Sequence, residues 1–101
     1  MLQDNNNIKK EIIRIFKEKM KVPHYRVLIF GSRASGQAEE RSDIDIGVDS
    51  NTSIAYSTLS EIEEMLEKIP VLQKIDVVDF SEINERFRQV ALRKIEVLYE
   101  Q

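Results

Sequence analysis

The sequence contains no cysteine and no tryptophan, and only 7% of its residues are aromatic. The absence of cysteine excludes disulfide bonds, thiolate metal sites and cysteine nucleophiles. No apolar run approaches the roughly 20 residues that a membrane-spanning helix needs. The N-terminal segment 1–7 is polar and does not have the pattern of a signal peptide. We therefore expect a cytoplasmic protein with a core of Ile, Leu and Val.

An excess of positive charge is also absent. The sequence has 15 Lys and Arg against 18 Asp and Glu, which gives a net charge of −3. A domain that binds nucleic acid by itself is usually basic, so the charge disfavours that class. A length of 101 residues fits one domain built around one modest core. We expect a single domain over residues 1–101, with no strong signal for nucleic-acid binding.

Hydrophobic periodicity predicts alternating helices and strands. Pro23 and Pro70 are expected to end the first two helices, and each of the three Asn residues at 5–7 is a suitable N-cap for the first. Ser81 is the expected N-cap of the last helix. The predicted elements are helix 8–20, strand 25–30, strand 43–49, helix 52–68, strand 74–80, helix 81–93 and a strand at 95–99, which we favour there over a final helical turn. This order predicts an α/β domain with helices packed on one sheet.

Two acidic residues lie two positions apart in the second predicted strand. Because side chains of a strand alternate between its faces, Asp43 and Asp45 are expected on one face and Ile44 on the other. Two neighbouring carboxylates repel each other, and Mg²⁺ relieves such repulsion because it prefers oxygen ligands. The pair alone is weak evidence, since many such pairs are ordinary surface residues.

The first predicted strand ends in Gly31-Ser32. Glycine allows the backbone to approach a phosphate closely and to adopt a positive φ, and Ser32 adds a hydroxyl group. The segment also fits an ordinary turn between a strand and a helix. It lacks the Gly-Lys-Ser/Thr ending of a P-loop.

Together the two signals are specific. Gly31-Ser32, ten intervening residues and then Asp43-Ile44-Asp45 resemble the signature of the DNA polymerase beta-like nucleotidyltransferase superfamily. The stretch LIFGSRASGQAEERSDIDIGV is similar to the small branch called minimal nucleotidyltransferase (MNT) proteins. The resemblance implies a mixed sheet with helices packed on it.

One position departs from the pattern of that family. Many relatives read Gly-Ser-x-Ala-Arg-Gly, whereas this chain has Ser35 in place of the basic residue. Arg33, and Arg41 further along, are candidates to contact the triphosphate instead. The departure bears on nucleotide affinity and leaves the acidic residues unchanged.

The resemblance also implies a third carboxylate on a neighbouring strand. Asp76 and Asp79 are both candidates, and they face opposite sides of a strand because they are three apart. Periodicity does not decide between them, since both faces of this strand carry apolar residues. The family pattern favours Asp76, which leaves Asp79 as a capping acid beside Ser81.

The resemblance implies transfer of a nucleotide from ATP or another NTP to a hydroxyl group, with two Mg²⁺ ions. Asp43, Asp45 and Asp76 are the expected metal ligands and catalytic residues, and Gly31, Ser32 and Arg33 are expected to bind the phosphates. Two metal ions of this kind act about 3.5–4 Å apart on an in-line displacement.

The family also implies a partner, because MNT proteins are typically encoded beside a HEPN-domain protein. MNT antitoxins AMPylate a tyrosine of that partner, often an RNase toxin, so we expect an antitoxin that transfers AMP to its partner. The alternative is a non-catalytic nucleotide-binding module that neutralises or scaffolds a HEPN partner. A homodimer or a hetero-oligomer fits either hypothesis.

Overall fold

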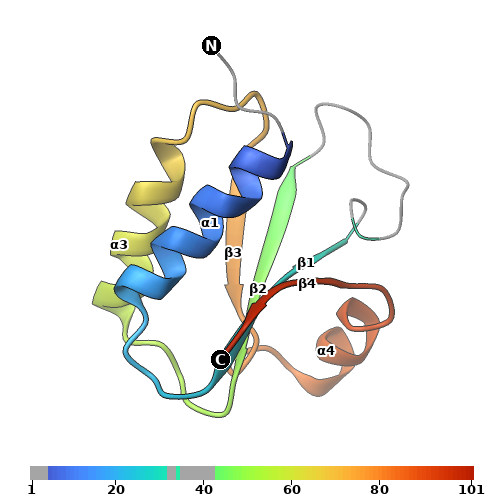
Figure 1. The fold of residues 1–101 in the computed structure, drawn as a ribbon. Coiled ribbons are helices and arrows are strands. Elements are labelled where there is room, and N and C mark those ends of the chain that lie inside the picture. Colours follow the sequence, from blue (N-terminus) through green and yellow to red (C-terminus); the bar gives the residue numbers. More distant parts are fainter. Residues whose placement is uncertain (1–4, 32–33, 35–42) are drawn as a thin grey trace.

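The computed structural model describes residues 5–31, 34 and 43–101 (Figure 1). Its seven named elements follow the predicted order. They are α1 (Asn5–Lys19), β1 (Tyr25–Phe30), β2 (Ile44–Ser50), α3 (Tyr56–Glu67), β3 (Ile75–Asp79), α4 (Glu85–Ala91) and β4 (Glu96–Glu100). The α/β class is confirmed, and so is the strand at the C-terminal end.

The four strands form one mixed sheet in the order β3-β2-β1-β4. Strand β1 is antiparallel to both β2 and β4, whereas β2 and β3 are parallel. A parallel pair needs a crossover connection, and α3 supplies it between β2 and β3. The predicted mixed sheet is therefore confirmed, with β3 and β4 as its edge strands.

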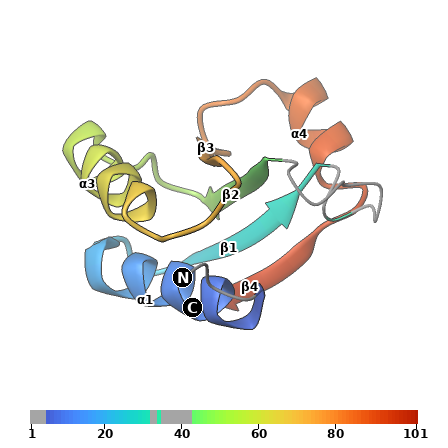
Figure 2. The same ribbon diagram turned by 90° about the horizontal axis from the view of Figure 1, so that it is seen from above.

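The helices cover the two faces of the sheet unequally. Figure 2 shows α1 and α3 on one face and α4 on the other. The strands alternate accordingly, because successive side chains point to opposite faces. The larger core lies under α1 and α3 and includes Phe16, Val27, Ile46 and Ile62. None of the described helices is long and apolar enough to cross a membrane.

A smaller core on the α4 face consists of Leu28, Phe30 and Phe80. The rings of Phe30 and Phe80 meet edge to face, with their centroids 5.2 Å apart. Gly47 lies beneath them, and a Cβ at this position would be 2.7 Å from a ring carbon of Phe80. The missing side chain of Gly47 therefore lets Phe80 pack directly on the sheet.

The second helix begins later than predicted, at Tyr56 rather than at residue 52. The backbone before it is held in a loop by side chains, because Ser50 Oγ accepts from Thr52 N–H and Asp79 Oδ2 accepts from Ile54 N–H. Ala55 is extended, with φ −58° and ψ 140°. Bonds from side chains to the backbone thus compete with the first turn of the helix.

Ser81 is not the N-cap of the last helix, so that prediction was wrong. Helix α4 begins at Glu85, and the side chain of Asn84 caps it by accepting from Phe87 N–H at 2.8 Å. The hydroxyl of Ser81 donates to Asp79 Oδ1 at 2.7 Å instead. Because its hydroxyl is bonded to Asp79, two residues earlier, Ser81 does not cap the helix.

The three Asn residues at 5–7 do not cap the first helix either. Asn5 is already the first helical residue of α1, so all three lie in the first turn. The position that precedes them lies outside the described residues.

Candidate functional site

Asp45 lies at the centre of the candidate site. It is paired with Phe30 of β1 on one side and with Asp76 of β3 on the other. Its neighbours Ile44 and Ile46 are buried in the core under α1 and α3, so Asp45 faces the opposite side of the sheet. The same face carries Phe30 and the α4 helix. Asp45 is half-buried there, between an apolar ring and a second carboxylate.

Burial raises the pKa of Asp45 above its ordinary value, and the charges of Asp76 and then Asp43 raise it further. Asp43 is exposed and immediately precedes β2, two positions from Asp45. Three acidic residues from two parallel strands therefore act electrostatically on one another. A cation near them would lower this repulsion.

Gly31 directly follows β1 and adopts φ +76°, the left-handed region that favours glycine. A Cβ at this position would lie 2.6 Å from Asp45 Oδ2. The absent side chain leaves the Gly31 backbone directly beside the carboxylate, which joins the two halves of the sequence signature. Ser32, Arg33, Ser35 and Arg41 lie outside the described residues.

Asp76 lies beside Asp45, and Lys74 lies two residues before Asp76, immediately ahead of β3. Lys74 Nζ is 3.5 Å from Asp76 Oδ1, and the Lys74 side chain is largely exposed. Within residues 5–31, 34 and 43–101, no group of three or more His, Asp or Glu side chains converges closely enough to hold a metal ion. The carboxylates therefore share one face of the sheet, while Asp76 is engaged by a lysine.

Asp79 lies on the other face of the sheet, away from Asp45. It is buried and accepts three hydrogen bonds, from Ile54 N–H, Ser81 N–H and the Ser81 hydroxyl. These donors come from the loops that flank α3 and β3. Asp79 thus fixes loop structure, and of the two candidates only Asp76 is adjacent to Asp45.

Asp49 also lies on the acidic face of β2, and its contacts were not predictable from local pattern. It accepts from Arg26 Nε at 3.0 Å, and its other oxygen is 2.9 Å from a guanidinium nitrogen of Arg88. Burial alone would raise the pKa of Asp49, but the hydrogen bonds and charges of Arg88 and Arg26 lower it below the ordinary value. The cluster fastens α4 to the sheet at the end remote from Gly31.

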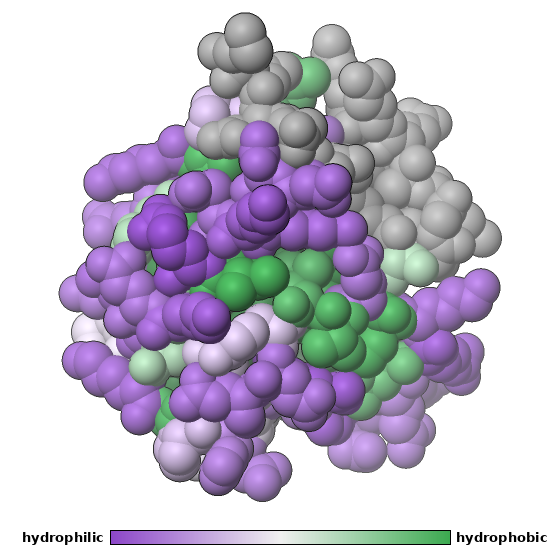
Figure 3. Space-filling model, in the orientation of Figure 1, coloured by the Kyte–Doolittle hydropathy of each residue, from purple (hydrophilic) through white to green (hydrophobic). Residues whose placement is uncertain are grey.

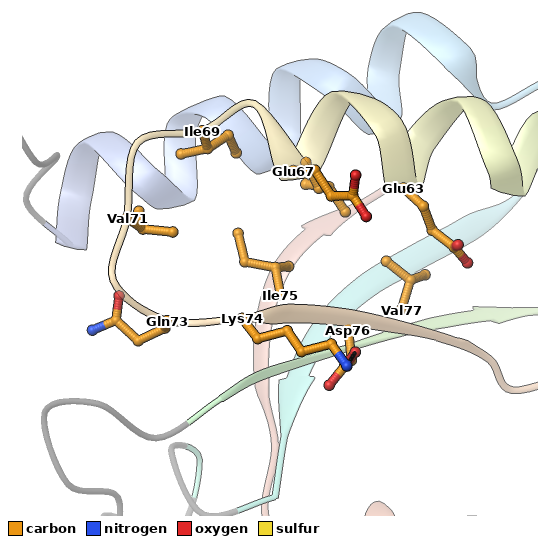
Figure 4. A pocket seen from close by; sticks show the side chains of 10 residues that line it. Glu63, Glu67, Ile69, Val71, Gln73, Lys74, Ile75, Asp76 and Val77 are labelled. Atoms are coloured by element: carbon orange, nitrogen blue, oxygen red, sulfur yellow. Dashed lines mark ion pairs between the residues drawn. The ribbon is translucent and has the colours of Figure 1, made fainter.

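Two pockets flank the acidic residues on opposite sides. One of about 590 Å³ lies beside Gly31 and is lined by apolar side chains of α4, with Arg93 and Lys94 at the helix end. Phe87 and Val90, which line this pocket, are exposed apolar residues of α4. Figure 3 shows an apolar area on this side of the molecule, near α4. The other pocket, of about 400 Å³, lies between α3 and β3 and reaches Asp76 (Figure 4).

Comparison with known proteins gives a consistent result. The chain is 29% identical over 97 residues to the probable protein adenylyltransferase MntA of Haemophilus influenzae, which covers 94% of this chain and 84% of that protein. It is 40% identical over 84 residues to a putative protein adenylyltransferase of Methanocaldococcus jannaschii, with 77% and 81% covered.

Among solved structures, the fold is similar to a chain in a complex of the tri-AMPylated Shewanella oneidensis HEPN toxin with MNT antitoxin. The TM-score is 0.66 at 18% identity, and the match covers 95% of this chain and 72% of that one. The family model described as "Polymerase beta, Nucleotidyltransferase" matches residues 10–101. Because that match spans most of its length, the chain belongs to the polymerase beta nucleotidyltransferase family.

Proposed function

We propose that this protein is a Mg²⁺-dependent protein adenylyltransferase that transfers AMP from ATP to a hydroxyl group of a HEPN-domain partner, as the antitoxin of a toxin–antitoxin pair. The observation that carries the proposal is the contact between Gly31 and Asp45, with Asp76 at the adjacent strand position. The relatives named protein adenylyltransferases support the reaction type. The structure that contains a tri-AMPylated HEPN toxin supports the class of partner.

The acidic residues fit Mg²⁺ by their chemistry. Asp43, Asp45 and Asp76 offer carboxylate oxygens on one face, and burial, with the charges of Asp76 and Asp43, raises the pKa of Asp45. We therefore assign these three residues as metal ligands and keep two ions as the expected number. Bound Mg²⁺ supplies charge neutralisation for the phosphates and lowers the pKa of the acceptor hydroxyl.

The residues proposed to bind the phosphates and the residue proposed to act on the acceptor lie on opposite sides of Asp45. The backbone at Gly31 lies close enough to the acidic residues to bind phosphate, and Ser32 and Arg33 are proposed to extend this contact. Asp76 lies on the far side and is placed to orient the acceptor hydroxyl and to receive its proton. Lys74 must release Asp76 for that role, and a 3.5 Å pair with a largely exposed lysine is weak enough to allow it.

The proposed transfer is a displacement at the α-phosphorus of ATP. A new bond forms between the acceptor oxygen and the α-phosphorus, and the bond from that phosphorus to the bridging oxygen of the β-phosphate breaks. Pyrophosphate leaves with the bonding electron pair, and the hydroxyl proton passes to Asp76 or to solvent. A reaction that consumes ATP fits the cytoplasm, whose reducing conditions also fit the absence of cysteine.

The test is incubation of the protein with α-labelled ATP, Mg²⁺ and the HEPN-domain protein encoded beside it, followed by electrophoresis. We expect label on the partner, and none when EDTA is added. A stable complex with an unlabelled partner would instead support the alternative, a nucleotide-binding module that neutralises its partner by binding alone. The similarity to proteins described as adenylyltransferases favours the enzyme over the binding module.

A further inference from the structure

The edge of the sheet at β3 has unused hydrogen-bonding groups. Among the described strands, β3 pairs only with β2. Lys74 O accepts from Ile44 N–H at 2.8 Å, and Phe80 N–H donates to Val48 O at 2.9 Å. Alternate residues of a parallel strand bond to the same neighbour.

The residues between these bonded positions therefore face outward. Ile75 and Val77 direct their N–H and C=O groups away from β2, toward the open edge of the sheet. An edge of this kind is a template for pairing with another extended segment.

A pocket lies directly along this edge (Figure 4). Ile75 and Val77 point from β3 toward α3 and, with Leu66, Ile69 and Val71, supply its apolar part. Glu63 and Glu67 extend from α3 over the same pocket. Asp76 lies at the border, with its side chain on the opposite face of the strand from Val77. One strand edge thus adjoins both the pocket and the acidic residues around Asp45.

The acidic side chains of the pocket favour a ligand with positive charge. Glu63 and Glu67 are exposed and take part in no ion pair with another described residue. Lys74, the cation among the residues that line the pocket, is paired with Asp76. A segment that enters the pocket with Lys or Arg side chains would therefore meet uncompensated negative charge, whereas an acidic segment would be repelled.

We propose that the β3 edge binds the acceptor segment of the partner protein as an added strand, with the acceptor hydroxyl opposite Asp76 and basic residues on either side of it. This arrangement follows because the side chains of an added strand alternate between the two faces of the sheet. The residue opposite Asp76 places its side chain on the Asp45 face, and both its neighbours place theirs in the pocket under α3. This inference rests on the proposed function and names the recognition element of its acceptor.

The test uses fluorescence anisotropy with the full-length protein and a labelled extended peptide that has Lys-Tyr-Lys at its centre. Binding is measured without ATP or Mg²⁺, so that it does not depend on catalysis. We expect saturable binding, and no binding of the matched Glu-Tyr-Glu peptide. The double variant Glu63→Gln/Glu67→Gln should weaken binding roughly three- to tenfold.

The matched control is Glu61→Gln/Glu64→Gln, which removes two charges from the same helix outside the pocket. It should change the affinity less than about twofold. Equal weakening by the two double variants, or failure of the Lys-Tyr-Lys peptide to bind, would overturn the proposal.

Backbone pairing is tested by N-methylation of the peptide. Methyl groups on one alternating set of amides should weaken binding about tenfold, and methyl groups on the other set should not. Indifference to both sets would contradict strand addition.

The two proposals fail separately. Label on the partner that is unaffected by Glu63→Gln/Glu67→Gln would overturn this inference and leave the adenylyltransferase in place. Peptide binding as described, without any label on the partner, would overturn the adenylyltransferase instead.

Discussion

Gly31 and Asp45 lie so close together that a Cβ on the glycine would be 2.6 Å from the carboxylate oxygen Oδ2. Gly31 directly follows β1 and Asp45 lies in the neighbouring strand β2, where it is paired with Phe30. The turn at Gly31, which we propose binds phosphate, and the acidic strand are therefore one structural unit. Any side chain at residue 31 disturbs both.

The variant Gly31→Ala tests this unit. The new Cβ would displace the Asp45 side chain, and alanine at φ +76° is strained by about 1 kcal/mol. We expect a small loss of stability but at least a tenfold loss of affinity for Mg²⁺-ATP, measured by isothermal titration calorimetry. Unchanged affinity in a fully folded variant would show that nucleotide does not bind beside Asp45.

The variant Asp45→Asn should stabilise the metal-free protein. Because the folded-state pKa of Asp45 is raised, its carboxylate opposes folding, and stability falls as pH rises from the unfolded-state pKa through the folded-state pKa. Asp45 is partly exposed, so solvent screening keeps the effect small, and we expect a gain of about 2–4 °C in Tm at pH 7.

The gain for Asp45→Asn should disappear at low pH, below the unfolded-state pKa, where both forms of the protein are neutral at this position. Thermal unfolding at several pH values in EDTA measures it. A Tm lower than wild type at neutral pH would contradict the electrostatic account of Asp45.

Asp49 should behave in the opposite way. Its folded-state pKa is lowered, so its pairs with Arg26 and Arg88 stabilise the fold above the unfolded-state pKa, and this stability is lost as pH falls through the folded-state pKa. Asp49→Asn should cost about 1–3 kcal/mol at pH 7 and much less at low pH, by urea denaturation. A cost that does not vary with pH would mean that packing, rather than charge, fastens α4.

The variant Gly47→Ala should disturb the smaller core, under α4. In Gly47→Ala the Cβ would lie 2.7 Å from Phe80 and 2.9 Å from Leu28, so these side chains must move. We expect a loss of about 1–3 kcal/mol in the free energy of unfolding. Equilibrium denaturation measures this loss, and an unchanged midpoint would mean that the core under α4 adapts freely.

The order of elements could be predicted from the sequence because it depends on local periodicity. The alternation in 43–49 and the apolar spacing in 8–20 reflect burial on one face, and the structure confirms both elements with small shifts of their ends. The starts of α3 and α4 could not be predicted. The start of α3 depends on a bond between segments far apart in sequence, from Ile54 N–H to Asp79. The start of α4 depends on local competition, since Ser81 bonds to Asp79 and Asn84 caps the helix instead.

The acidic residues illustrate the same limit at the candidate site. The spacing of Asp43 and Asp45 places them near each other, but periodicity could not separate Asp76 from Asp79. Only strand pairing places Asp76 next to Asp45 and turns Asp79 toward the loops around α3. The partnership of Asp49 with Arg88, 39 positions later in the numbering, likewise left no local signal.

The most direct test of the account compares AMP transfer by three isosteric variants with that of the wild type. Label from α-labelled ATP on the HEPN-domain partner is measured for Asp45→Asn, Asp76→Asn and Asp79→Asn, with folding checked by circular dichroism. We predict a loss of about a hundredfold or more for the first two, since each removes a carboxylate proposed to bind metal, and transfer within about threefold of wild type for folded Asp79→Asn. Full transfer by Asp76→Asn, or a loss confined to Asp79→Asn, would contradict the assignment of the site.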